Sequence, residues 1–320
     1  MMELLAKLKG GSLSETVVLS NGNLKIVRKL ISRYRDREYG LVRWQSQIRK
    51  LSELNSHIPY SCPNVIRMGS SETHYFYDIP FYDDALNCVD ALLNGVPPSL
   101  LAKKIIELIL KLKSVEQGTC RGSLSVFIAE EMREPLLIAR QALNCERLQL
   151  SSDESSYLNK KISEVLPTID SYVDRYQNFE ISESLTHGNL TLENLLWLQD
   201  SQKLIMIDPY AETYCNSYLG DISQVLQSCA SGYEYISSLY ESEEFELSEY
   251  PFNRLPNCFK VFKDIFTTNF PDNNIFSSEV LTLFKSAQFL RMFPFKMINN
   301  PRMGVGFMLH GIGILEETLC

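Results

Sequence analysis

Residues 185–221 read LTHGNLTLENLLWLQDSQKLIMIDPYAETYCNSYLGD, and the interpretation of the whole chain starts from this stretch. It contains two short apolar runs, Leu195–Leu198 and Leu204–Ile207. The polar segment between them, Gln199–Lys203, includes Asp-Ser, which suits a tight reversal between antiparallel strands. The stretch therefore predicts a polar loop, a β-hairpin and a second polar loop.

Two oxygen-bearing side chains lie at the ends of this predicted hairpin. Asn194 comes just before the first strand and Asp208 just after the second. Antiparallel pairing brings the outer ends of two strands together, so we expect the amide and the carboxylate side by side. Hard oxygen donors of this kind can hold a Mg²⁺ ion that keeps most of its water and takes phosphate oxygens as further ligands.

The loop before the hairpin places these two residues in a recognisable pattern. It reads His187-Gly188-Asn189-Leu190-Thr191-Leu192-Glu193-Asn194, and Ile207-Asp208 ends the second strand. This arrangement resembles the catalytic core of the aminoglycoside phosphotransferase and choline kinase family, which has the protein-kinase-like fold. The family's loop has the form His-Gly-Asp-x-x-x-x-Asn, followed by a hairpin and Ile-Asp. The chain matches each position except Asn189, where the family carries its catalytic Asp.

The resemblance implies a role for each matching residue. Asn194 and Asp208 become Mg²⁺ ligands, and His187 becomes a residue that structures the loop. Asp221, on the next predicted helix, becomes a buried acid that braces the catalytic loop. Position 189 becomes the one that orients the acceptor hydroxyl. The alternative is an ordinary hairpin with polar ends, but the loop, the spacing and the downstream Asp together favour the kinase-like interpretation.

The composition is that of an ordinary folded protein. The chain has 320 residues, enough for one large domain or two smaller ones, and 45% of them are hydrophobic. Its formal net charge of −8 argues against a nucleic-acid partner, because such proteins usually concentrate Lys and Arg to neutralise phosphates. A local basic patch around Arg28–Arg37 is the exception left open.

The cysteines and the N-terminus bear on the location of the protein. The eight cysteines are scattered, and none forms the Cys-x-x-Cys pair that clips zinc, so free thiols are predicted. No segment reaches the roughly 18 consecutive apolar residues of a membrane-spanning helix. Met1–Gly10 carries Glu3, Lys7 and Lys9 in place of the apolar stretch of a signal peptide. We therefore expect a cytoplasmic, reducing location and no membrane insertion.

A glycine-containing turn followed by a hairpin is predicted near the N-terminus. Asn21-Gly22, a strong short-range hairpin signal, lies between the apolar runs Thr16–Leu19 and Leu24–Ile31. Gly10-Gly11-Ser12 precedes the first strand, as a similar turn does in the family. Glycine lets backbone N–H groups approach anionic oxygens, so these three residues are candidates for contact with nucleotide phosphates.

The second strand of that hairpin carries the candidate phosphate-binding cation. Family members end this strand with a Lys or Arg that reaches the α- and β-phosphates. Arg28 matches best by register and Lys29 is the alternative, and the two cannot share the task because successive side chains point to opposite faces of a strand. Two solvated cations at a strand end are the other interpretation.

A helix is predicted over Glu38–Leu54. Its apolar residues are spaced three to four positions apart, at Leu41, Trp44, Ile48, Leu51 and Leu54. Kinases use a Glu on this helix to pair with the strand cation. The expected position falls near Gln47, with Glu38 the more distant acid, so the presence of that ion pair is left open.

The remaining segments predict a hinge and a helical region. Two further strands, Val65–Met68 and Thr73–Tyr77, lead to a hinge at Ile79-Pro80-Phe81, where Pro80 and Phe81 suit either stacking on adenine or plain packing. Beyond the hinge, helical patterns occur at Leu100–Leu112, Val126–Leu143, Tyr157–Tyr176, after Asp221 and from Glu279. The acidic run Glu241–Glu249 is either a solvated loop or a receiver for a cationic substrate.

These features predict an α+β protein with the two-lobed protein-kinase-like fold. Residues 1–80 would form a small β-rich N-lobe and residues 81–320 a large, mainly helical C-lobe. The implied function is ATP- and Mg²⁺-dependent phosphoryl transfer to a hydroxyl of a small molecule, such as an amino sugar, sugar or choline-like acceptor, weak or absent because of Asn189. The alternative is a pseudokinase that serves as a nucleotide-binding or scaffold protein. The acceptor, the oligomeric state and the origin of Asn189 are left open.

Overall fold

The computed structural model describes residues 2–8, 14–22, 24–33, 37–143, 150–242 and 254–319. The chain divides into two compact units. The first consists of Met1–Ala91 and His187–Glu212, and the second of Leu92–Thr186 and Thr213–Cys320. The predicted hairpin of residues 195–207 therefore belongs to the same unit as the N-terminal strands. The predicted lobe boundary after residue 80 stays a prediction.

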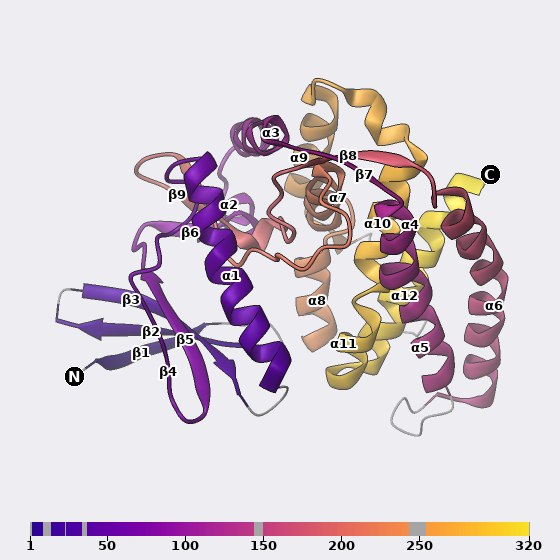
Figure 1. Cartoon of the computed structure of the whole chain (residues 1–320), viewed down its shortest axis with the longest axis horizontal. Coiled ribbons are helices and arrows are strands. Elements are labelled where there is room, and N and C mark those ends of the chain that lie inside the picture. The colour runs from indigo at the N-terminus through magenta and orange to yellow at the C-terminus, as the bar shows by residue number, and fades with distance from the viewer. Residues whose placement is uncertain are drawn as a thin grey trace. The chain divides into compact units, whose positions relative to one another are not determined.

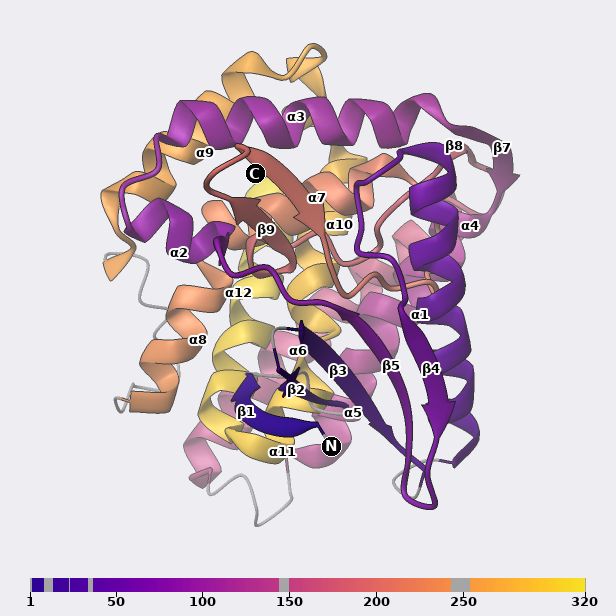
Figure 2. The ribbon, with the colours of Figure 1, turned by 90° about the vertical axis from the view of Figure 1, so that its left-hand side faces the viewer.

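The first unit is built on a five-stranded antiparallel sheet with the order β1-β2-β3-β5-β4 (Figure 2). Its strands are β1 (Glu3–Leu8), β2 (Ser14–Asn21), β3 (Leu24–Ser32), β4 (Arg67–Ser70) and β5 (His74–Pro80). The long helix α1 (Arg37–His57) packs against β3 and β5 (Figure 1). Trp44 fixes this packing, because its Nε1 donates a hydrogen bond to the carbonyl oxygen of Phe76 at 3.0 Å and its ring stacks on Tyr75.

The N-terminal hairpin forms as the Asn-Gly signal predicts. β2 pairs with β3 as far as Asn21, which lies opposite Leu24. Gly22 follows with a φ of +64°, in the left-handed region that glycine enters without steric cost. The predicted N-terminal hairpin is thus confirmed, and it leads directly into the strand that carries the two candidate cations.

A second, three-stranded sheet contains the hairpin that the central motif predicts. Its order is β10-β9-β6, and its strands are β6 (Ala85–Asn87), β9 (Leu195–Leu198) and β10 (Lys203–Met206). Leu195 lies opposite Met206, so the outer ends of β9 and β10 meet as expected. The N–H of Met206 also donates to the carbonyl oxygen of Ser61 at 2.7 Å, which ties this hairpin to the segment after α1.

The second unit is mainly helical. A short helix, α2 (Cys88–Leu93), runs from the first unit into it, and a two-stranded sheet joins β7 (Glu116–Arg121) to β8 (Glu180–Ser184). The other helices are α3 (Pro98–Ser114), α4 (Ser123–Ile128), α5 (Glu134–Ala142), α6 (Ser152–Arg175), α7 (Tyr218–Cys229), α8 (Tyr233–Ser242), α9 (Asn257–Asn269), α10 (Glu279–Leu290), α11 (Phe293–Asn299) and α12 (Pro301–Leu319). Helices α4, α5, α6, α10 and α12 share one apolar core. The predicted α+β class, with a β-rich N-terminal part and a helical C-terminal part, is confirmed.

One predicted helix departs from regular α-helical geometry. The run predicted over Val126–Leu143 contains α4 and α5 separated by a π-helical segment, Ala129–Arg133. Pro135 follows this segment and has no N–H to donate, so the regular ladder of α-helical hydrogen bonds cannot continue through it. The acidic run of residues 241–249 lies outside the described residues from 243 onward.

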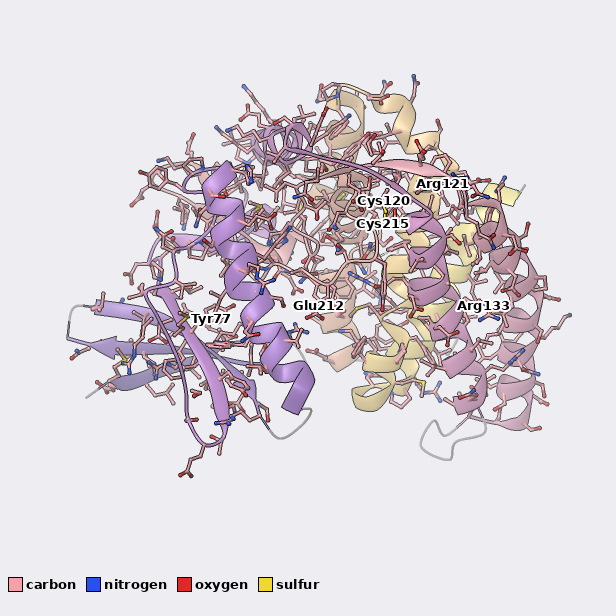
Figure 3. The ribbon with its side chains drawn as sticks, viewed as in Figure 1. Tyr77, Cys120, Arg121, Arg133, Glu212 and Cys215 are labelled. Atoms are coloured by element: carbon pink, nitrogen blue, oxygen red, sulfur yellow. The ribbon has the colours of Figure 1, made fainter. Side chains whose placement is uncertain are left out.

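The described cysteines are free thiols, and the described helices lack the features of membrane spans. The cysteines at 62, 88, 120, 215, 229 and 258 are free, as predicted, and Cys120 lies near Cys215 in the second unit (Figure 3). Cys145 and Cys320 lie outside the described residues. Within the described part of the chain, no helix is both long and apolar enough to cross a membrane.

Candidate functional site

The two hairpin ends bring Asn194 and Asp208 to the same place in the first unit. Asn194 closes a short 3₁₀ turn, Leu192–Asn194, just before β9. Asp208 lies two residues after β10, and the N–H of Ile207 donates to the carbonyl oxygen of Asn194 at 2.9 Å. The expected proximity of these two residues is therefore present in the structure. Their metal-binding roles stay predictions.

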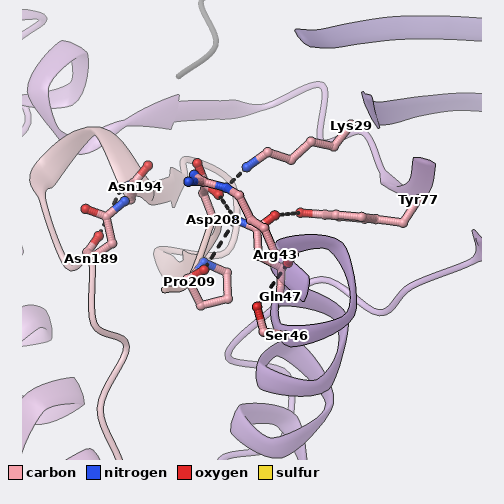
Figure 4. A network of polar contacts seen from close by, with 9 residues as sticks. All are labelled: Lys29, Arg43, Ser46, Gln47, Tyr77, Asn189, Asn194, Asp208 and Pro209. Carbon is pink, nitrogen blue, oxygen red and sulfur yellow. Dashed lines mark hydrogen bonds and ion pairs between the residues drawn. The ribbon is translucent and has the colours of Figure 1, made fainter. Parts of the chain in front are cut away.

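Asp208 is the centre of a polar network (Figure 4). Its Oδ1 accepts from the ammonium of Lys29 and, at 2.6 Å, from Nε2 of Gln47. Removal from water raises the pKa of the Asp208 carboxyl, but the opposing charge and hydrogen bond of Lys29 outweigh this effect and hold the pKa below its usual value. Asp208 is thus an anion at neutral pH.

Lys29 reaches this network from the middle of β3. The side chain is buried, and burial lowers its pKa below the usual value although the charge of Asp208 acts in the opposite direction. The ion pair with Asp208 joins strand β3 to the end of the hairpin. Lys29 is therefore held in a largely dry position beside a candidate metal ligand.

Arg28, the other candidate cation, faces away from Asp208. It pairs with Asp78, directly opposite on β5, through hydrogen bonds of 2.6 and 2.8 Å to the two carboxylate oxygens. Its guanidinium also lies over the ring of Phe76, 4.4 Å from the centroid. Register allowed only one of the two residues to face the site, and the structure places Lys29 there, whereas the best sequence match was Arg28.

Gln47, near which the acid of kinases was expected, is an uncharged residue of α1. It is buried on α1, and its Nε2 donates both to Asp208 and, at 3.4 Å, to the carbonyl oxygen of Pro209. Its Oε1 accepts from the hydroxyl of Tyr77 at 3.4 Å. The amide therefore links helix, sheet and hairpin by hydrogen bonds and brings no charge. Glu38 also lies on α1, but its side chain is outside the described part of the structure.

Arg43 is a member of the site that the sequence analysis did not identify. It lies four residues before Gln47 on α1, and Figure 4 shows its guanidinium beside the Asp208 carboxylate. Its positive charge contributes to lowering the pKa of both Asp208 and Lys29. The sequence signal that could have revealed it is the spacing of four from Gln47, which puts both residues on one helix face.

The loop that carries Asn189 folds back on itself. The carbonyl oxygen of Asn189 accepts from the N–H of Thr191 and from Nδ2 of Asn194, both at 2.9 Å. The second bond orients the Asn194 amide: its nitrogen donates to Asn189, and its oxygen, Oδ1, takes no part in this bond. Gly188 has a φ of +77°, a conformation that glycine adopts readily, and this permits the sharp turn before Asn189.

His187 is the buried residue of this loop. Its side chain has no solvent exposure, and burial lowers its pKa to about 4, against the opposing charge of Asp208. The imidazole is therefore neutral at pH 7. The carbonyl oxygen of His187 accepts from the N–H of Tyr210 at 3.0 Å, which ties the loop to the segment after Asp208.

The remaining predicted site residues belong to the hinge, to helix α7 and to the N-terminal glycine turn. Pro80 ends β5 opposite Ile26, and the N–H of Phe81 donates to the carbonyl oxygen of Lys25 at 3.4 Å; both side chains are half-buried. Asp221 is buried in the first turn of α7, in the second unit. The turn Gly10-Gly11-Ser12 lies outside the described residues. The roles assigned to all of these residues stay predictions.

The donor set at the hairpin ends fits one magnesium ion. The Asn194 amide oxygen and Asp208 Oδ2, which neither Lys29 nor Gln47 contacts, are hard oxygen donors of the kind that Mg²⁺ prefers. In the described part of the chain, no group of three or more His, Cys, Asp or Glu residues could hold a metal. A metal at this position would therefore complete its shell with water and ligand oxygens.

Comparisons with known proteins give matches in structure alone. No family model matches the chain, and no curated protein matches its sequence. A protein from Haemophilus somnus 129PT, assigned as a fructosamine-3-kinase, matches with a TM-score of 0.55 at 14% identity, over 98% of this chain and 92% of its own. The chain has a protein-kinase-like fold.

A second solved structure supports the same kinase-like fold. Spectinomycin phosphotransferase, APH(9)-Ia, in complex with ADP and spectinomycin, matches with a TM-score of 0.51 at 10% identity, over 98% of this chain and 88% of its own. Both neighbours are described as small-molecule phosphotransferases. The resemblance read from the 35-odd residues around the hairpin thus agrees with a likeness in fold that spans nearly the whole chain.

Proposed function

We propose that this protein binds ATP and Mg²⁺ in its first unit and has the architecture of a phosphotransferase that acts on a small-molecule hydroxyl. The observation that carries the proposal is the network in which Lys29 of β3 meets Asp208 of the hairpin, next to Asn194, in a kinase-like fold. The structural neighbour APH(9)-Ia, solved with ADP and spectinomycin, supports a nucleotide and a small-molecule acceptor as ligands.

The roles follow from the charges of the site residues. Lys29 would exchange part of its contact with Asp208 for the α- and β-phosphates of the nucleotide. Asn194 and Asp208 would hold the metal, which when bound would neutralise charge on the phosphate oxygens. Gly10, Gly11 and Ser12 would contact phosphates through backbone N–H groups, and Pro80 and Phe81 would border the adenine. His187 would keep the loop in place.

Asn189 limits the chemistry that this proposal allows. An Asp at this position would accept or orient the proton of the acceptor hydroxyl, whereas an amide has almost the same shape and no basic oxygen near neutral pH. General-base assistance is commonly worth about 10²–10⁴-fold in rate. We therefore expect the chain to bind its ligands and to transfer phosphate slowly or not at all.

A specific observation favours the pseudokinase as the second candidate function. Two positions where kinases carry acids, 47 and 189, hold amides in this chain. In the structure the Gln47 amide makes three hydrogen bonds, to Tyr77, Asp208 and Pro209, so its neighbours accommodate an uncharged side chain at this position. A protein that holds a nucleotide as a structural or signalling ligand would need no base at position 189.

One experiment separates the two candidates. Asn189→Asp should create or increase phosphotransferase activity by about two orders of magnitude on the general-base estimate. The assay is ADP release with Mg²⁺-ATP across a panel of amino sugars, sugars, choline and nucleosides. Asn189→Ala is the matched control, because it removes the amide without adding a base.

The outcome that would reject the enzyme is equally specific. If Asn189→Asp binds Mg²⁺-ATP but releases no more ADP than the unmodified protein with every acceptor, the scaffold alternative takes its place. A further substitution, Asp208→Asn in the Asn189→Asp background, should remove any gain. If the gain persists, the released ADP does not come from the proposed site.

A further inference from the structure

The surroundings of the Gln47 side chain allow its amide one orientation. Its Nε2 lies 2.6 Å from Oδ1 of Asp208 and 3.4 Å from the carbonyl oxygen of Pro209. Both of these oxygens are acceptors, so the amide group that faces them has to be the donor, NH₂. On the other side of the amide, the hydroxyl of Tyr77 donates to Oε1 at 3.4 Å (Figure 4). The reversed amide would place its oxygen against a carboxylate, so the three contacts together fix the orientation.

The amide makes these bonds away from water. Gln47 on α1 and Tyr77 on β5 are each 2% exposed. A buried hydrogen bond is electrostatically stronger than one in water, and a buried polar group that loses its partner is costly. The neighbouring Ser46 adds a second link, since its Oγ donates to Oε1 of Glu212 at 3.3 Å. Helix α1 therefore holds the segment after β10 at two points, and one of them is the carboxylate of Asp208.

An uncharged donor has a specific advantage beside Asp208. Under the proposed function, Lys29 gives up part of its contact with this carboxylate when phosphates bind. The bond from Gln47 to Oδ1 can persist through that exchange, because the amide neutralises no charge and Asp208 keeps its full attraction for a cation. Lys29 and Gln47 both contact Oδ1, and Oδ2 is the oxygen that the proposed metal would use. Loss of a group that orients a metal ligand in this way commonly costs about 10–100-fold in metal affinity.

We propose that Gln47 is a positioning residue for the metal-binding carboxylate of Asp208, and that Tyr77 acts through it by holding the amide in its orientation. The inference rests on the proposed nucleotide and Mg²⁺ function and adds to it the residues that aim the metal ligand. Helix α1 thus contacts the metal ligand itself, whereas the corresponding helix of kinases pairs with the strand cation.

The test separates metal binding from phosphate binding. ATP is titrated calorimetrically into the full chain, once in Mg²⁺ and once in EDTA, and the ratio of the two dissociation constants measures the contribution of the metal. Gln47→Met removes the donors with little change in side-chain size, and it should reduce this ratio by about tenfold or more. Affinity in EDTA should stay nearly constant, because Lys29 still faces the phosphates.

Two further variants test the hydrogen bonds themselves. Gln47→Glu keeps the shape of the side chain and the acceptor for Tyr77, but it replaces the donor by a second carboxylate that faces Asp208. The ratio should therefore fall at least as far as in Gln47→Met. Tyr77→Phe removes one hydroxyl and keeps the ring, so the ratio should fall by less, roughly two- to tenfold, which is the size of a hydrogen bond between neutral groups.

Matched controls are available on the same two elements. Gln45→Met makes the first substitution at an exposed position of α1, two residues before Gln47. Tyr75→Phe removes a hydroxyl from the same face of β5, at a ring that stacks on Trp44. Neither control should change the ratio. Thermal melting of each variant identifies a temperature at which all of them are folded, and the titrations are run there.

The outcomes distinguish this inference from the function on which it rests. If Mg²⁺ strengthens ATP binding to the unmodified chain and the ratio is unchanged in Gln47→Met and Tyr77→Phe, the inference fails and the proposed function stands. Equal losses of affinity in Mg²⁺ and in EDTA would make Gln47 a residue that supports the fold alone, and would also overturn the inference. So would a ratio in Gln47→Glu that equals or exceeds that of the unmodified chain. If the unmodified chain gains nothing from Mg²⁺, the proposed metal site is rejected, and the inference with it.

Discussion

Arg28 and Lys29 are neighbours on β3, yet they form ion pairs of two different kinds. Arg28 pairs with Asp78, which lies directly opposite on the adjacent strand. Lys29 pairs with Asp208, which is 179 residues further along the chain. The first pair connects two strands of one sheet, and the second connects that sheet to a separate hairpin.

The two carboxylates also differ in how fully they are satisfied. The side chain of Asp78 is 1% exposed, and both of its oxygens accept from one guanidinium. The side chain of Asp208 is 26% exposed, and Lys29 and Gln47 share a single oxygen. A bidentate pair has little capacity for another ligand, whereas Asp208 keeps an oxygen for one. We therefore interpret the first pair as structural and the second as ligand-binding.

The largest expected effect is on stability and comes from the Arg28 pair. Arg28→Met leaves the buried carboxylate of Asp78 without its bidentate partner, and breaking a buried pair in this way costs roughly 3–5 kcal/mol of unfolding free energy. Lys29→Met should cost less, because Asp208 keeps Gln47 and contact with water. Urea denaturation measures both. Equal losses would show that the two pairs are not different in kind.

A second test concerns pH and uses His187, which lies near the ligand-binding pair. Its pKa is about 4 in the folded protein and about 6.5 in an unfolded chain. The unfolded state therefore binds more protons between these values, and the contribution to stability is lost as the pH falls from about 6.5 to 4. The expected loss is roughly 3 kcal/mol.

Variants isolate this contribution of His187 from those of other groups. His187→Asn should flatten the pH dependence of the unfolding free energy between pH 7 and 4, whereas His57→Asn, at an exposed position, should leave it unchanged. Equilibrium denaturation at a series of pH values provides the measurement. If both variants behave alike, His187 is not the source of the acid sensitivity.

The third expected effect is on nucleotide affinity, where the loss of Lys29 should matter more than the loss of Arg28. Lys29→Met should raise the dissociation constant of Mg²⁺-ATP by roughly ten- to a hundredfold, the value of a hydrogen bond to a charged group. Arg28→Met should leave this constant unchanged once the protein is folded. Titration at a temperature where both variants are folded provides the measurement. Loss of affinity in Arg28→Met alone would return the phosphate-binding role to Arg28.

The smallest expected effect concerns Asp221, a buried acid outside both pairs. Truncation of a buried carboxylate leaves its hydrogen-bond donors unpaired, at roughly 1–3 kcal/mol for an unsatisfied group. Asp221→Ala should therefore lower the melting temperature of the ligand-free protein. Unchanged stability combined with lost Mg²⁺-ATP binding would instead give Asp221 a direct role in the ligand site.

The parts of the site that were predictable from sequence depend on local spacing. Asn194 and Asp208 were expected side by side because both flank one hairpin, whose pairing is fixed by two apolar runs and a short turn. The choice between Arg28 and Lys29 was not local. It depends on which face of β3 lies toward a hairpin distant in sequence, and no pattern within the strand contains that information.

Arg43 illustrates a second limit of the sequence. An arginine on an amphipathic helix is usually a solvated residue, and its position beside Asp208 arises from how α1 packs on the sheet. The position of Gln47 follows from spacing along the chain. Its bonds to Tyr77 and Pro209, however, join α1 to β5 and to the segment after β10, which are distant in sequence. Tertiary packing, more than local pattern, thus determines the charge of the site.

The backbone at Asp208 restricts which mutations are open to this position. Its φ is +55°, a left-handed conformation that costs most side chains roughly 1–2 kcal/mol and that Asp, Asn and Gly tolerate best. A lineage that loses the need for a metal could therefore replace Asp208 by Asn or Gly at little cost in folding. Substitution by Val or Ile would strain the turn itself. Evolutionary drift at this position is thus confined to a few residue types, and one of them is Asp, the proposed metal ligand.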